Sequence, residues 1–147
     1  MLHPSEHPLA LTAVLRRHGL TVLPASERVP VLLWLRRDTD PTSVLRMAAR
    51  GTRVTLEEHD PSSFTTLELR AACDCAEHRS AGTRARTVLV PGVLPRRTAV
   101  VDGRERYGWT GVTAGRLDLA GVAPLLDGLV ADLDAGLPNV PALAATG

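Results

Sequence analysis

Residues 29–35 read VPVLLWL, a continuous apolar run of strand length. A run without polar alternation is typical of a strand buried on both faces, because neither side of it carries side chains that favour water. Strands of this kind occur mainly in parallel or mixed sheets that helices cover on both faces. The stretch therefore predicts a fold built around a buried sheet flanked by helices.

The segments around this run alternate between helical and extended patterns. Residues 8–18 carry apolar side chains at helical spacing, and Gly19 suits the end of a helix. Asp40 followed by Pro41 has the sequence of a helix start, and Gly51 suits its end. The elements expected up to residue 57 are a helix at 8–18, strands at 21–23, 29–35 and 52–57, and a helix at 40–51.

Beyond residue 60, Ser62 or Ser63 suits a helix start, and Asp102-Gly103 is a strong turn signal between two extended stretches. The elements expected here are a helix at 62–82 carrying Phe64, Leu67, Ala71 and Cys75, a strand at 83–90, a hairpin of 98–101 with 106–109, and a helix at 117–133. This order predicts an α/β sandwich with a mixed, mainly parallel sheet flanked by helices. We assign residues 1–136 to a single domain and 137–147 to a Pro/Ala-rich flexible tail.

Composition and charge restrict the class of protein. The chain has 147 residues, 44% of them hydrophobic, which suits one domain with a continuous core. Its net charge is +1 and every cationic side chain is Arg, so we expect no attraction to membranes or nucleic acid, and no Schiff-base chemistry. The amino terminus lacks the pattern of a signal peptide, and no stretch approaches the roughly 20 apolar residues of a membrane span. We expect a cytoplasmic protein.

Two blocks of sequence carry a family likeness. The first is RGTRVTL at 50–56, and the second is AGTRART at 81–87 followed by LPRRTAVVDG at 94–103. Together with the helix expected between them, they resemble the phospholipase D-like domain that accompanies helix-turn-helix segments in actinobacterial TrmB-like and LuxR-type regulators. The likeness covers about residues 29–111. It implies a phospholipase D-like sandwich. Because catalytic members join two half-domains across one site, it also implies a homodimer or another protein partner.

The catalytic motif of that superfamily, H-x-K followed by Asp, is degenerate in this chain. By the resemblance, its His, Lys and Asp positions fall on Pro95, Arg97 and Asp102. Proline carries no nucleophile, so the covalent phosphohistidine step cannot occur there, and we expect no hydrolysis of phosphodiesters. The residues before 29 provide one helix and no helix-turn-helix pair, so we expect no direct nucleic acid binding.

The candidate ligand site consists of His59, Arg97, Asp102 and Trp109, because open α/β sheets bind ligands at strand ends. Arg97 replaces a phosphate-binding Lys by a planar cation that grips a carboxylate or phosphate in two places, which predicts a small anionic effector. A simpler interpretation of each residue stays open. In that interpretation Asp102 serves only the Asp-Gly turn, Arg97 is a solvated strand residue, and His59 belongs to a loop.

Cys73, Cys75 and His78 could suggest a metal site. On a helix Cys73 points away from the other two, and zinc usually takes about four convergent ligands. Cysteines that pack as small hydrophobic side chains explain the pattern equally well, and we expect no metal.

The sequence therefore predicts a non-catalytic phospholipase D-like protein, without cofactor or catalytic residues. It would bind an effector or dock as an accessory subunit, serving a regulator or a specialised biosynthetic pathway. The alternative is a small cytosolic enzyme that uses His59, Asp60 and Glu58 as acid and base groups, although adjacent strand residues point to opposite faces. A third hypothesis is a DNA-associated regulator that acts through a separate helix-turn-helix partner.

Overall fold

A computed structural model describes residues 7–24, 26, 31–69 and 84–136 of the chain. The chain divides into two compact units, residues 1–60 with 94–147, and residues 61–93. The larger unit contains the hydrophobic core described below. The smaller unit is described by itself.

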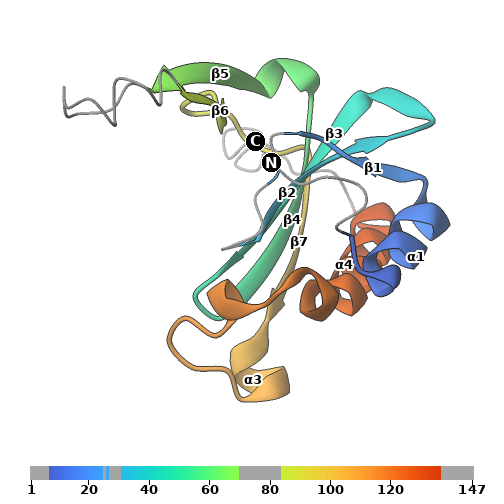
Figure 1. Ribbon diagram of the computed structural model, residues 1–147, viewed down its shortest axis with the longest axis vertical. Coiled ribbons are helices and arrows are strands. Elements are labelled where there is room, and N and C mark those ends of the chain that lie inside the picture. The colour runs from blue at the N-terminus through green and yellow to red at the C-terminus, as the bar shows by residue number, and fades with distance from the viewer. Residues whose placement is uncertain (1–6, 25, 27–30, 70–83, 137–147) are drawn as a thin grey trace, which may run out of the picture. The chain divides into compact units, whose positions relative to one another are not determined.

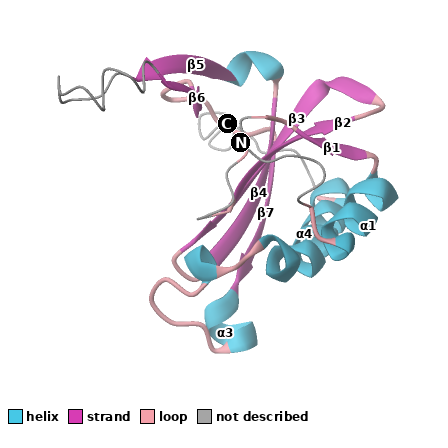
Figure 2. Ribbon diagram, in the orientation of Figure 1, coloured by secondary structure: helices cyan, strands magenta, loops and turns pink. Residues whose placement is uncertain are grey.

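The larger unit is built on a five-stranded sheet in the order β1-β2-β3-β4-β7 (Figures 1 and 2). The strands are β1 (Leu20–Val22), β2 (Leu32–Arg37), β3 (Asp40–Arg50), β4 (Arg53–His59) and β7 (Arg97–Asp102). Every neighbouring pair is antiparallel. The expected sandwich with a mixed, mainly parallel sheet is therefore wrong. The resemblance to the phospholipase D-like family and the half-domain pairing that it implied stay predictions.

Two helices pack against each other and against the sheet (Figure 1). They are α1 (Leu9–His18) and α4 (Leu119–Ala135), which confirms the helices predicted at 8–18 and 117–133. Gly19 ends α1 at φ 62°, a left-handed conformation that costs glycine little. The side chain of Asp118 accepts a hydrogen bond from the Gly121 amide and caps α4. Within the described residues, no helix is long and apolar enough to cross a membrane.

The hydrophobic core lies between these helices and the sheet face that they cover. One cross-strand row through β2, β3, β4 and β7 consists of Leu33, Met47, Leu56 and Ala99, all of them buried. The helices contribute Leu11, Val14, Leu15, Leu119, Val122, Ala123, Leu126, Leu129, Val130 and Leu133. Each large aliphatic side chain buried here stabilises the fold by about 1.5–3 kcal/mol. The helices are thereby held on one side of the sheet.

The stretch expected as a helix at 40–51 is the central strand β3, so that prediction is wrong. Leu45 and Ala49 face the helices, whereas Val44 and Ala48 lie on the opposite face, and all four are buried. A strand buried on both faces loses the alternation of apolar and polar residues. Its apolar positions then also fit helical spacing, and the sequence alone does not distinguish the two.

The hairpin expected around Asp102-Gly103 is also wrong. Asp102 ends β7 and its side chain accepts a hydrogen bond from the Arg104 amide, which caps the short helix α3 (Gly103–Tyr107). The chain then passes through Gly108 and a 3-10 turn, η3 (Ala114–Arg116), to α4. The Asp-Gly pair thus starts a helix instead of turning a strand.

The smaller unit contains the 3-10 turn η2 (Pro61–Ser63) and an antiparallel pair, β5 (Phe64–Leu69) and β6 (Arg84–Leu89). Strand β6 confirms the strand predicted at 83–90. The helix expected from Ser62 or Ser63 is wrong over β5, and its remaining part, with Ala71 and Cys75, lies outside the described residues. The tail expected at 137–147 also lies outside them.

Candidate functional site

A polar pocket opens where one row of the core turns from apolar to charged. In this row Leu35 and Leu45 pair across β2 and β3, and Glu58 and Arg97 continue it on β4 and β7. The pocket has a volume of about 610 Å³ and is lined by Arg37, Thr39, Asp40, Glu58, Arg96, Arg97 and Asp134. It therefore lies on the helix-covered face, at the ends of β2, β4 and β7.

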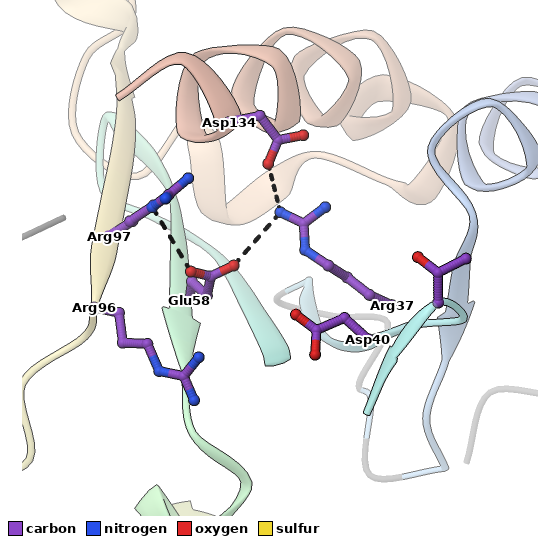
Figure 3. A pocket seen from close by; sticks show the side chains of 7 residues that line it. Arg37, Asp40, Glu58, Arg96, Arg97 and Asp134 are labelled. Carbon is purple, nitrogen blue, oxygen red and sulfur yellow. Dashed lines mark hydrogen bonds and ion pairs between the residues drawn. The ribbon is translucent and has the colours of Figure 1, made fainter. Parts of the chain in front are cut away.

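The carboxylate of Glu58 is the centre of this pocket (Figure 3). Its side chain is only 12% exposed, and it accepts a hydrogen bond of 2.9 Å from the buried Ser43 hydroxyl. The guanidinium of Arg37 lies 3.6 Å from one of its oxygens and that of Arg97 lies 3.9 Å from the other. A carboxylate removed from water needs such partners, because an unpaired buried charge is strongly destabilising.

Arg37 is fixed in place from two sides. Its Nη2 donates to Asp134 Oδ1 at 2.6 Å, near the end of α4, while it also faces Glu58. Its side chain is 16% exposed. A half-buried guanidinium between two carboxylates is a structural cation and has little freedom to follow a ligand.

Arg97 is held much less tightly. Its side chain is 32% exposed, and its contact with Glu58, at 3.9 Å, is longer than a hydrogen bond. Among the described residues no acceptor lies within hydrogen-bonding distance of its guanidinium, which carries five N–H donors. The side chain of Arg97 therefore presents unused donors to the pocket.

Arg96 closes the neighbouring side of the pocket. Its Nη2 donates to the Thr42 carbonyl at 2.7 Å and to Asp60 Oδ2 at 2.9 Å. Asp40 accepts hydrogen bonds from the Thr42 hydroxyl and amide, and these hold the pKa of Asp40 below its usual value. The lining thus carries three guanidinium groups and three carboxylates. Arg37 pairs with Glu58 and Asp134 of the lining, whereas Arg96 and Asp40 are bonded to residues outside it.

The four residues predicted to form a ligand site do not come together. His59 follows Glu58 on β4 and points to the opposite face of the sheet, where its side chain is fully buried. There its Nε2 lies 3.4 Å from Glu57 Oε1, and its Nδ1 has no hydrogen-bond partner among the described residues. The contact with His59 lowers the pKa of Glu57, with help from Arg46.

Asp102 and Trp109 lie at the other end of β7 from Arg97. Five residues of strand separate Asp102 from Arg97, about 16 Å. The Asp102 carboxylate is occupied by Arg104 at 2.8 Å and Arg53 at 3.3 Å, and hydrogen bonds from Arg104 hold its pKa well below the usual range. Trp109 packs on Gly103 and against the core. The simpler interpretation, in which Asp102 serves an Asp-Gly turn, is wrong as well, because Asp102 caps α3.

The acid and base groups of the enzyme hypothesis do not converge either. Glu58 faces the pocket, His59 is buried on the opposite face, and Asp60 is exposed and paired with Arg96. The described residues contain no group of three His, Cys, Asp or Glu side chains that could hold a metal ion. Cys73, Cys75 and His78 lie outside the described residues.

The ligand site predicted from the sequence did not include five of the residues that line the pocket, Arg37, Thr39, Asp40, Arg96 and Asp134. The charged ends of three strands, Arg36-Arg37, Glu57-Glu58 and Arg96-Arg97, were the available signal. Their convergence requires the antiparallel register, which the predicted topology did not contain.

No family model matches this chain, and neither the curated proteins nor the solved structures include one that is similar to it.

Proposed function

We propose that this protein is a non-catalytic binding protein whose pocket takes a small ligand with a carboxylate or phosphate group. The observation that supports this most directly is Arg97. It is a half-buried guanidinium that makes no hydrogen bond with the described residues, at the rim of a cavity large enough for a small molecule. Such a group binds a planar carboxylate or a phosphate through two parallel hydrogen bonds.

The neighbouring charges support a binding role over a catalytic one. Glu58 and Arg37 are engaged with each other and with Ser43 and Asp134, which favours a structural role for both. The same contacts keep the pocket wall fixed when Arg97 moves toward an anion. A fixed wall reduces the entropy lost on binding.

The experiment is a comparison of parent, Arg97→Ala and Arg36→Ala proteins by calorimetry against phosphate, succinate and citrate. Arg36 is a matched control, because it is exposed on the opposite face of the same sheet and does not line the pocket. We expect Arg97→Ala to weaken binding by about 1.5–3 kcal/mol, roughly 10- to 150-fold, and Arg36→Ala to leave it unchanged.

Both variants should remain folded. Arg36 is an exposed strand residue, and Glu58 keeps its contacts with Arg37 and Ser43 when Arg97 is removed. Equal affinity of the parent and the Arg97→Ala protein would refute the proposed role of Arg97. Failure of all three anions to bind the parent would refute the anionic ligand itself.

A further inference from the structure

A second cluster of arginines lies at the opposite end of the sheet from the pocket. We call it the basic rim, and its members are Arg50, Arg53, Arg104, Arg106 and Arg116. Hydrogen bonds join the three segments that carry these arginines. The Gly103 amide donates to the Thr52 carbonyl, and the Ala114 amide donates to the Gly51 carbonyl, both at 2.8 Å. The turn between β3 and β4, helix α3 and η3 therefore form one end of the unit (Figure 1).

The basic rim contains more arginines than carboxylates. Residues 50–53 and 102–116 contain five arginines against two carboxylates, Asp102 and Glu105, a net charge of +3. The whole chain has a net charge of +1, so the remainder is net negative. Among the described residues, the ion pairs of the rim are those of Arg53 and Arg104 with Asp102, and Arg50, Arg106 and Arg116 form none.

One contact within the rim is unfavourable for folding. Arg50 and Arg53 are directly opposite each other across the β3–β4 pair, and both are exposed. Like charges at opposed positions of two strands destabilise a sheet. Of these two arginines only Arg53 is paired with Asp102, so no ion pair among the described residues compensates the charge of Arg50.

Exposed apolar side chains lie in the same segments as these arginines. Tyr107 is 45% exposed and Val112 is 55% exposed. The Tyr107 ring stacks on Trp109 with ring centroids 5.2 Å apart, and the guanidinium of Arg106 lies over it at 5.4 Å. Trp109 is itself anchored against Gly103 and the core, so Tyr107 is held in a defined position. Tyr and Arg on a fixed support are typical of the centre of protein interfaces.

We propose that the basic rim is a docking surface for a protein partner that presents an acidic segment containing an apolar residue. Carboxylates of the partner would pair with Arg50, Arg106 and Arg116, and the apolar residue would cover Tyr107 and Val112. A single-stranded nucleic acid fits less well. Such ligands are bound by several stacking aromatics along a positively charged groove, and this rim offers one exposed aromatic ring on a chain of net charge +1. The proposal is independent of the ligand pocket.

The test measures fluorescence anisotropy of the full chain with three labelled probes. They are a Glu-rich peptide with a single Leu, an all-Glu peptide of the same length, and oligothymidylate. The main variant is Arg50→Glu with Arg106→Glu. Its control is Arg16→Glu with Arg36→Glu, two exposed arginines outside the rim whose reversal changes the net charge equally. A further variant, Val112→Ser, removes an exposed apolar side chain without changing charge.

We expect the Leu-containing peptide to bind most tightly and its affinity to fall with added salt. The rim double variant should weaken binding at least about tenfold and the control double variant less than about threefold. Val112→Ser should weaken the Leu-containing peptide only. No binding of either peptide, equal loss in both double variants, or tighter binding of oligothymidylate than of the peptides would overturn the proposal.

Discussion

Replacing Gly103 with alanine should destabilise the protein through Trp109 alone. A β-carbon at this position would lie 2.0 Å from Trp109 Cε3 and 2.1 Å from Cδ2. Ordinary contacts of such an atom are between 3.4 and 4 Å, so either the indole or the α3 backbone must move by more than an ångström. The backbone of Gly103 does not have a positive φ, and its conformation is open to alanine. The expected loss is therefore steric.

The magnitude depends on how the clash is relieved. If the backbone of α3 shifts and the indole stays against the core, overpacking costs about 1–3 kcal/mol. If the indole is expelled, a side chain that buries about 150 Å² loses about 4 kcal/mol at about 25 cal/mol per Å². A chain of this length loses about 2–4 °C in Tm per kcal/mol. We therefore expect a fall in Tm of about 2–16 °C, together with a change in Trp fluorescence.

Gly128→Ala is the matched control. Gly128 lies in the interior of α4, and a β-carbon there meets no atom within 4 Å. The same chemical change should raise the stability by about 0.5–1 kcal/mol, because alanine loses less conformational entropy in a helix. Urea unfolding of the parent and both variants measures the two effects. A Gly103→Ala protein as stable as the parent would show that Trp109 is not packed on α3 as described.

Two further predictions concern stability. Gly19→Ala places a side chain at φ 62° and should cost about 1–2 kcal/mol by thermal unfolding, and an unchanged Tm would mean that α1 ends differently. Because contact with His59 lowers the pKa of Glu57 below its ordinary value of 4.5 in the folded state, Glu57 contributes stability above that pH and loses it as the pH falls through the lowered value. Between about pH 5 and pH 3 the urea midpoint should therefore fall less steeply in the Glu57→Gln protein than in the parent. Parallel plots of urea midpoint against pH for the two proteins would contradict this.

The amino-acid sequence by itself determined the elements whose signals are local. The apolar spacing of residues 8–18 with Gly19 behind it predicted α1, and the spacing of residues 117–133 predicted α4. Strand β4 followed from its alternation of buried and polar residues. In each case the pattern is complete within one element, because caps and periodicity depend on neighbours a few residues away.

The tertiary structure alone decided β3, the antiparallel order of the sheet and the pocket. Residues 40–50 suit a helix or a strand, and pairing with β2 and β4 selects the strand. Arg37 meets Asp134 across 97 residues of chain, a contact that no local pattern encodes. Strand pairing depends on residues that are far apart in the sequence. A one-residue change in register would move Glu58 to the opposite face of the sheet. The register therefore places Glu58 and Arg97 in one pocket and leaves His59 behind the sheet.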